Sequence, residues 1–438
     1  MIPSMFRKAM VGDGSTLNLD FTTMTATADL TARGLTFTRG STGTRINASG
    51  FVETMSNNVA RFDHDPTTLT PRGLLIEGSA SNVLQYSEAV DQSPWFTAGT
   101  VARATFTGGN GPNGVNNSGS KLSATSISSA SSLYYNGLTL TAQTYTMSVF
   151  AKADGANWIW VNIQQGATIH GAFFDLSGNG ALGNTTGTVV SGSNIITKYQ
   201  NGWFRLQFSF TGTASSWFPV LLPCTSNGTG YASITGQAPN GVLVYGCQIE
   251  TGSGASSYIP TGASQATRNS DICYITNTDY GFTTTGGTYF VEWERGEYDN
   301  PTVSGSDCFP FSTDYASGRW LAIFTTPGGT TTSAASWSGQ INQTSTAVAG
   351  RNRAAVSYAG WNATTTLTFS ANGNSPTSNA SMTLGTTPTY LMIGAASSTA
   401  PYNGGGLRDI LGNRVRRLKY WPFVLPSATL QSITVNTP

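Results

Sequence analysis

The stretch Trp158-Ile-Trp-Val-Asn-Ile-Gln164 decides the fold, because apolar and amide side chains alternate along it with a period of two. Successive side chains of a β-strand point to opposite faces of the sheet. The alternation divides the stretch into two sets, Ile159, Val161 and Ile163 on one face and Trp158, Trp160, Asn162 and Gln164 on the other. The first face is aliphatic, as a sandwich core requires. The second face is aromatic and rich in amides.

A second stretch, Trp203-Phe-Arg-Leu-Gln-Phe-Ser-Phe210, alternates in the same way and presents Trp203, Arg205 and Gln207 opposite a row of phenylalanine and leucine. We expect both polar faces to point outward and to form one kind of surface. Indole rings cover the apolar C–H face of a sugar, while amides and a guanidinium bind its hydroxyls. The predicted glycan-binding residues are Trp158, Trp160, Asn162, Gln164, Trp203, Arg205 and Gln207. The alternative is that the tryptophans pack beneath a loop or against a neighbouring subunit.

The rest of the chain repeats this strand pattern. Short runs rich in Val, Ile, Thr and aromatic residues alternate with Gly, Asn and Ser clusters, and amphipathic helical periodicity is almost absent. This predicts an all-β protein with two consecutive β-sandwich, jelly-roll domains after a short irregular N-terminal attachment segment. The expected divisions are 1–86 for the attachment or collar segment, 87–268 for the jelly roll and 269–438 for the second sandwich. Because residues 1–86 contain few long strands, we expect them to need a partner surface.

Composition excludes several classes of protein. Charged residues make up 10% of the 438 residues, against about 25% in typical domains, and the net charge is +1. No field of one sign draws the chain to nucleic acid or to an anionic membrane. Apolar residues never form a membrane-spanning run of about 18, and the N-terminus lacks the apolar core of a secretory signal. We expect synthesis and folding in a cytoplasm.

Two carboxylates raise the question of catalysis. Gly73-Leu-Leu-Ile-Glu77 and Cys247-Gln-Ile-Glu250 each place Ile-Glu before a run of small residues. A glycoside hydrolase needs two carboxylates that face each other across a cleft, so this pair is either catalytic or marks two similar junctions. Glu292 and Glu294, at i and i+2 of one strand, and Asp175 are the other acid/base candidates. Strand-face carboxylates are usually solvated or paired, and no catalytic residue is predicted.

Metal and cofactor chemistry also lacks a clear signal. The four cysteines, Cys224, Cys247, Cys273 and Cys308, are scattered without a CxxC pair, which favours small buried thiols over a zinc site or disulfides. His64 lies between Asp63 and Asp65, so a structural calcium ion is an alternative to the favoured solvated turn. No cofactor and no metal site are expected.

Several motifs together resemble the N-terminal segment of tailed-bacteriophage fibre and head-spike proteins. They are Arg39-Gly-Ser-Thr-Gly-Thr-Arg45, Gly50-Phe-Val-Glu53, Ala60-Arg-Phe-Asp63, Pro71-Arg-Gly-Leu-Leu-Ile-Glu77 and Ser79-Ala-Ser-Asn-Val-Leu84. In that family a carbohydrate-binding-module-like jelly roll follows, which Tyr145–Lys152 and Asn201–Arg205 resemble. A concanavalin A-like lectin/glucanase sandwich comes next, and Arg416-Arg-Leu-Lys-Tyr-Trp-Pro422 is similar to its closing strand.

The resemblance implies a non-enzymatic component of the virion surface that displays lectin-like domains toward host surface glycan. Residues 1–86 would mount it on other virion proteins, and the resemblance implies that Glu77 and Glu250 mark the two ends of the jelly roll and accept hydrogen bonds from nearby backbone. A homo-oligomer is expected, a trimer or, alternatively, a fivefold vertex arrangement. The rivals are a glycan-degrading tailspike enzyme and a purely structural capsid decoration protein. The resemblance supplies no sugar-contacting residue.

Overall fold

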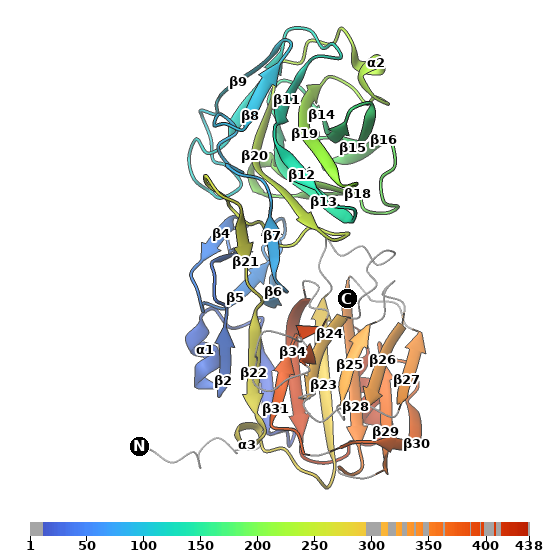
Figure 1. Ribbon diagram of the computed structural model, residues 1–438. Helices are drawn as coiled ribbons and strands as arrows, with labels where there is room; N and C mark the ends of the chain where they lie inside the picture. Colours follow the sequence, from blue (N-terminus) through green and yellow to red (C-terminus); the bar gives the residue numbers. More distant parts are fainter. Residues whose placement is uncertain are drawn as a thin grey trace.

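The computed structural model describes residues 12–294, 308–313, 321–325, 331–336, 339–344, 350–361, 364–385, 387–394, 396–397, 407–408 and 413–436. These residues form antiparallel sheets with a few short helices, so the expected all-β class of β-sandwiches is confirmed. Figure 1 shows two stacked bodies, a jelly roll above and a second sandwich below, with a narrow connection between them. Within the described ranges no helix is long and apolar enough to cross a membrane.

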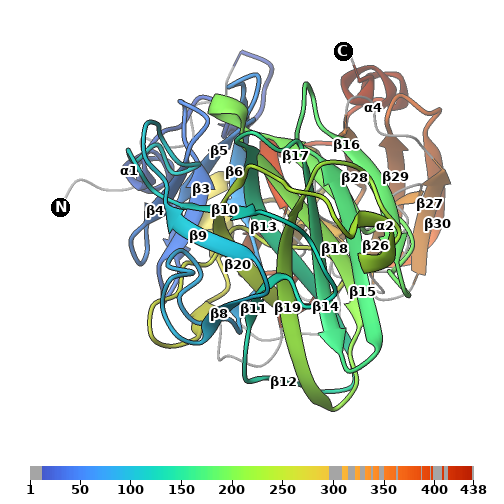
Figure 2. The same cartoon turned by 90° about the horizontal axis from the view of Figure 1, so that it is seen from above.

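The jelly roll consists of two facing antiparallel sheets. The inner sheet, which faces the rest of the molecule, has the order β17-β18-β13-β20-β10-β9, and the outer sheet has the order β16-β15-β14-β19-β11-β8, with β12 beside β19. In Figure 2, β15 and β16 lie at one edge and β8 and β9 at the other. The elements are β8 (Trp95–Ala98), β9 (Val101–Thr105), β10 (Ser120–Ala124), β11 (Ser132–Tyr135), β12 (Leu138–Leu140), β13 (Thr144–Ala153), β14 (Trp158–Gln165), β15 (Thr168–Asp175), β16 (Ala181–Thr186), β17 (Ile195–Lys198), β18 (Phe204–Thr211), β19 (Ser215–Cys224), α2 (Tyr231–Ile234) and β20 (Val242–Thr251).

The second sandwich also has two sheets. One has the order β30-β29-β28-β23-β34-β6-β5 with β1 beside β34, and the other has the order β2-β22-β31-β24-β25-β26-β27. The elements are β1 (Leu17–Asp20), α1 (Thr27–Ala32), β2 (Leu35–Thr38), β5 (Arg61–His64), β6 (Pro71–Ile76), β22 (Ile272–Thr276), α3 (Asn277–Tyr280), β23 (Gly287–Glu294), β24 (Cys308–Thr313), β25 (Ala322–Thr325), β26 (Thr331–Ser336), β27 (Gly339–Thr344), β28 (Arg351–Tyr358), β29 (Thr364–Ala371), β30 (Thr377–Thr383), β31 (Tyr390–Ile393), β34 (Asn413–Trp421) and α4 (Ser427–Thr434). Two short strands, β32 (Ala396–Ser397) and β33 (Leu407–Arg408), pair with each other.

The N-terminal strands belong to this second sandwich, and in this the structure differs from the expected three-part division. Leu17 of β1 pairs with Tyr420, and Leu35 of β2 pairs with Ile275. Their side chains join one buried core with strands from the C-terminal third of the chain. Residues 1–86 were expected to need a partner surface, and the partner for their described strands is the chain itself. The jelly roll is thus an insertion between two sequence segments of one sandwich.

The two bodies are connected by a two-stranded stem. Here β7 (Ala80–Asn82) leads into the jelly roll and pairs antiparallel with β21 (Ala266–Arg268), which leads out of it. Beside the stem, the hairpin of β3 (Gly43–Ile46) and β4 (Val52–Met55) packs its apolar side chains against the inner sheet of the jelly roll. Both ends of the insertion are therefore held at one place, which we call the junction.

Candidate functional site

The alternation predicted for β14 is confirmed, but the predicted exposure is wrong. Ile159, Val161 and Ile163 lie in the jelly-roll core. Trp160 and Asn162 lie on the other face of the strand and are nevertheless 0% exposed, and Trp160 is part of the buried jelly-roll cluster, while Trp158 and Gln164 are half-buried. The reason is a second layer of side chains, because the indole of Trp160 stacks on Phe173 at 5.1 Å and meets Tyr231 of α2 edge-on at 4.9 Å.

The polar face of β18 is also covered. Trp203 is 0%, Arg205 2% and Gln207 1% exposed. The Trp203 Nε1 donates a 2.9 Å hydrogen bond to the carbonyl of Asn110, and the ring packs with Ile46 and Val52 of the β3–β4 hairpin. This hairpin and the loop between β9 and β10, which carries Asn110, cover Trp203 and make this part of the face an internal interface.

The two strands also do not form one surface. β14 belongs to the outer sheet and β18 to the inner sheet, so their polar faces point to opposite sides of the sandwich. The expectation of a shared outward platform is therefore corrected. Of the seven predicted side chains, only Trp158 and Gln164 keep partial access to solvent.

A different set of rings is exposed on the outer sheet. The register pairs Phe96 with Tyr134 and Gln164 with Phe218, so these residues share one face. The ring centroids of Phe96 and Tyr134 are 5.8 Å apart, and those of Tyr134 and Phe218 are 6.4 Å apart. Phe96 is 39% exposed, and the other two rings are partly exposed. We call Phe96, Tyr134 and Phe218 the aromatic row.

A depression near α2 is lined in part by Trp160 and by Ile169, and Ile169 pairs with Gln164 across the sheet. Gln164 donates hydrogen bonds to the Tyr231 hydroxyl (3.1 Å) and to Asn162 Oδ1 (2.8 Å), and so connects the row to Trp160 beneath α2. The depression has a volume of about 430 Å³ and a rim of hydroxyl groups from Thr168, Thr188 and Thr229. Pockets for small ligands usually measure about 300–1,000 Å³.

His170 also lines this depression. Its Nδ1 accepts a 2.9 Å hydrogen bond from the Thr188 backbone N–H, and its ring stacks near Trp217 at 5.8 Å. Burial lowers the pKa of His170, which favours the neutral imidazole. Among the described residues that line the depression there is no Asp, Glu, Lys or Arg.

Sequence reasoning missed the aromatic row for a specific reason. The short strands at 95–98 and 132–135 place one aromatic side chain on each face, Trp95 with Phe96 and Tyr134 with Tyr135. Alternation separates the members of each pair, and Trp95 and Tyr135 are the buried ones. The available signal was that two consecutive aromatic residues occur in each of these strands. A single sequence does not show, however, that the two strands lie side by side in the sheet.

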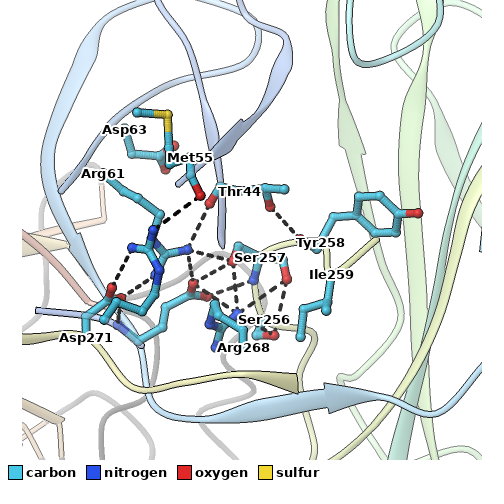
Figure 3. Close-up of polar contacts among 12 residues, drawn as sticks. Thr44, Met55, Arg61, Asp63, Ser256, Ser257, Tyr258, Ile259, Arg268 and Asp271 are labelled. Carbon is cyan, nitrogen blue, oxygen red and sulfur yellow. Dashed lines mark hydrogen bonds and ion pairs between the residues drawn. The ribbon is translucent and has the colours of Figure 1, made fainter. Parts of the chain in front are cut away.

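The junction contains a buried network of charged side chains (Figure 3). Arg61 lies between two carboxylates and donates to Glu77 at 2.7 Å and to Asp271, and its side chain is 0% exposed. Asp271 also accepts a 3.0 Å hydrogen bond from Arg39. These residues come from the N-terminal segment and from the chain leaving the jelly roll, so the network fixes both ends of the insertion.

Each of the two junction carboxylates is held by a serine of the chain that leaves the jelly roll. Glu77 accepts hydrogen bonds from the N–H (2.7 Å) and the hydroxyl (2.6 Å) of Ser257, and Glu250 accepts the corresponding pair from Ser256 (2.7 and 2.6 Å). We predicted that both carboxylates accept hydrogen bonds from nearby backbone at the two ends of the jelly roll. The N–H groups of Ser256 and Ser257 confirm this prediction. Each carboxylate is thus engaged by a neighbouring serine, and both line the same cavity at the junction.

The same junction shifts the two pKa values in opposite directions. Burial opposes ionisation of Glu77, but the guanidiniums of Arg268 and Arg61 outweigh it and hold the pKa well below its usual range. Burial raises the pKa of Glu250, and Ser256, Arg268 and Gln248 only partly offset the effect. The network therefore favours the ionised form of Glu77, whereas burial works against ionisation of Glu250.

Replacing Glu77 with glutamine should make the pH dependence of this network measurable. Because the folded pKa of Glu77 is depressed below the unfolded value of about 4.3, its contribution to stability is present above pH 4.3 and is lost as pH falls through the folded pKa. We expect Glu77→Gln to cost about 3 kcal/mol at pH 7 and less at pH 3. Urea denaturation of both proteins at each pH measures this difference, and a cost that stays constant with pH would contradict the assignment.

The other acid/base candidates are also engaged. Glu292 binds Arg353 and Arg416, both at 3.2 Å, and Glu294 binds Arg72 and Arg416, both at 2.7 Å. Asp175 accepts a hydrogen bond from the N–H of Ser177 at 2.9 Å. These contacts are those of paired or turn-capping carboxylates.

The two carboxylates beside His64 bind different partners, and the described cysteines are free. Asp63 binds Arg414 at 2.5 Å, whereas Asp65 caps its own turn by accepting the N–H groups of Thr67 and Thr68. Among the residues that the structure describes, no three His, Cys, Asp or Glu side chains gather as a metal site requires. The thiols Cys224, Cys247 and Cys273 are free and buried, and the side chain of Cys308 lies outside the described residues.

Solved structures to which this chain is similar include a carbohydrate-binding module and laminin domains. The CBM40 of the Ruminococcus gnavus IT-sialidase is 16% identical and covers 35% of this chain and 84% of its own, with a TM-score of 0.26. Domains LG4-5 of the mouse laminin alpha1 chain are 12% identical and cover 66% of this chain and 87% of their own, with a TM-score of 0.21. No protein-family model and no curated protein sequence matches the chain.

Proposed function

We propose that the protein binds glycan through the outer sheet of its jelly roll, at the aromatic row and the depression near α2. The observation that supports this proposal is the exposure of three neighbouring rings whose cross-strand partners are uncharged. The rings offer apolar surface to sugar C–H groups, and the amide of Gln164 and the threonine hydroxyls offer hydrogen bonds to sugar hydroxyls. Such binding needs no titrating group and no metal.

The proposal includes the wider role that the sequence motifs imply. The chain is then a non-enzymatic virion protein, a head spike or a tail fibre, made in the host cytoplasm and displayed on the virion surface toward host glycan. Its partners are other virion proteins, contacted through the N-terminal region, and further copies of itself in a trimer or at a fivefold vertex. The motifs between Arg39 and Leu84 support this role.

The guanidiniums that bind Glu77, Glu292 and Glu294 favour a binding function over a glycan-degrading one. General acid catalysis needs a carboxyl group free to donate a proton to the leaving group. Glu292 and Glu294 are each bound by at least two guanidiniums, and Glu77 by Arg61 and Arg268. Incubation of purified protein with its glycan ligand tests this point, and accumulation of shortened sugars would contradict a binding-only role.

Removal of the central ring should weaken glycan binding. We expect Tyr134→Ala to lower the affinity about tenfold or more, because a large apolar side chain that becomes fully covered contributes about 1.5–3 kcal/mol and about 1.4 kcal/mol corresponds to tenfold. A glycan array identifies a ligand for the wild-type protein, and titration calorimetry then compares the variants.

The matched control is Phe423→Ala, which removes a 41% exposed ring from the second sandwich. This variant should bind as the wild type does. Equal losses in the two variants, or unchanged binding by Tyr134→Ala, would contradict the assignment of the aromatic row as the glycan site.

A further inference from the structure

The junction encloses a cavity that is separate from the aromatic row. Its volume is about 160 Å³, and its walls come from the β3–β4 hairpin, the inner sheet of the jelly roll and the loop Thr251–Tyr258. A cavity of about 150 Å³ holds a small molecule such as benzene. Ser79 and Thr251 at its margin are exposed, so the cavity has an opening to solvent.

The charges that line this cavity are unequal. Four guanidiniums line it, those of Arg45, Arg205, Arg268 and Arg414, against three carboxylates, those of Asp63, Glu77 and Glu250. Asp63 is bound to Arg414, and Glu77 is bound to Arg268 and Arg61. Arg45 is bound at 2.8 Å to Glu53, which lies outside the lining. The lining residues themselves carry one more guanidinium than carboxylates.

The excess charge lies where solvent screens it weakly. Attraction between charges is several times stronger in a partly buried site than in water. Arg268 is 1% exposed, and its buried Nε–H has no hydrogen-bond partner among the described residues. A buried donor without a partner costs free energy that a bound acceptor restores.

The remaining walls suit a small organic ring. Phe150, Tyr199 and Tyr258 supply aromatic surface, and the rings of Phe150 and Tyr199 meet edge-on at 5.2 Å. Ser253 and Ser256, from the loop that also carries Tyr258, are among the other lining residues. Apolar walls with a few convergent polar groups, located between two domains, are typical of ligand sites.

We propose that the junction cavity binds a small oxyanion, namely the carboxylate of an acidic sugar, between the guanidiniums of Arg45, Arg205 and Arg268. The opening beside Ser79 and Thr251 leaves room for the rest of a glycan chain outside the cavity. This site lies on the inner sheet and is distinct from the aromatic row on the outer sheet. It adds an acidic-sugar specificity that the aromatic row does not provide.

Binding to three probes tests the proposal on the full chain. Titration calorimetry and thermal unfolding are carried out with glucuronate, glucose and inorganic phosphate. We expect glucuronate to bind and to raise the melting temperature, since a ligand of the folded state stabilises it, whereas glucose should have no effect at the same concentration. Competition by phosphate would support an oxyanion site that accepts either source of the anion. Equal effects of glucuronate and glucose, or no effect of any probe, would overturn the proposal.

Two variants locate the binding. Arg45→Gln removes one guanidinium whose side chain is 15% exposed, and we expect glucuronate affinity to fall about tenfold. Ser253→Phe places a ring at the half-buried rim of the cavity and should abolish binding. Glucuronate binding that survives in Ser253→Phe, with a wild-type melting temperature, would overturn the site. Tyr134→Ala should retain glucuronate binding, which separates failure here from failure of the aromatic row.

Discussion

Replacing Arg61 with methionine is expected to lower the free energy of unfolding by about 3–5 kcal/mol, the cost of removing one partner from a buried ion pair. The Arg61 side chain is 0% exposed and holds two carboxylates, Glu77 and Asp271. It also donates to the Thr44 carbonyl at 2.8 Å and to the Ser257 hydroxyl at 2.8 Å. Methionine fills similar space but leaves both carboxylates with less compensation. Differential scanning calorimetry measures the effect.

The matched control is Lys121→Met, which breaks an ion pair of ordinary surface type. Lys121 and Asp154 are 2.7 Å apart, with side chains 38% and 42% exposed. Such pairs contribute about 0–1 kcal/mol, so the control should unfold almost as the wild type does. If both variants lost the same small amount, the junction network would not be what holds the ends of the insertion together.

The fold class was predictable from the sequence because a two-residue period is local. In β14 the buried set of Ile159, Val161 and Ile163 follows from the alternation alone, and the strand bounds are close to the predicted ones. The pairing of β1 with β34 was not predictable, because Leu17 and Tyr420 are separated by nearly the whole chain. Local patterns identify a strand, whereas the choice of its neighbour depends on the global topology.

The N-terminal region illustrates the same limit. Its few short strands correctly indicated that it needs a surface on which to bury Leu17, Leu19 and Phe21. Nothing in the local pattern distinguishes a surface on another subunit from one supplied by residues as distant in the same chain as Leu418 and Tyr420. Because the second sandwich supplies it, the burial of these side chains no longer requires oligomerisation, and the oligomer rests on the family resemblance alone.

The candidate site was less predictable than the fold. Alternation assigns side chains to two faces of a sheet but does not say which face a later segment covers. Trp203 faces away from the jelly-roll core as expected, yet the β3–β4 hairpin buries it. The junction network was equally hidden, since Arg61 and Asp271 carry no motif that pairs them across 210 positions. Their roles depend on the return of the chain to the same place after the insertion.

Replacing Trp160 with alanine is expected to destabilise the jelly roll by about 3–5 kcal/mol, the usual cost of truncating a buried tryptophan. The indole is 0% exposed, stacks on Phe173 and supports Tyr231 of α2. Its Nε1 donates to the Thr186 hydroxyl at 3.3 Å, so the truncation also leaves that hydroxyl without its donor. Calorimetric unfolding of the full chain measures the loss.

The control is Trp158→Ala on the same strand and the same face. Trp158 is only partly buried, so folding removes less apolar surface from water at Trp158 than at Trp160. Truncation of Trp158 should therefore cost about 1–2 kcal/mol. This comparison distinguishes a packing role of Trp160 from a sugar-contacting role. A packing role predicts that Trp160→Ala loses more stability than Trp158→Ala, whereas a sugar-contacting role does not. If Trp160→Ala abolished glycan binding while its unfolding matched that of the wild type, the indole would be an accessible contact and its burial beneath α2 would be refuted. We expect instead that its effect on binding, measured well below the melting temperature, is smaller than that of Tyr134→Ala.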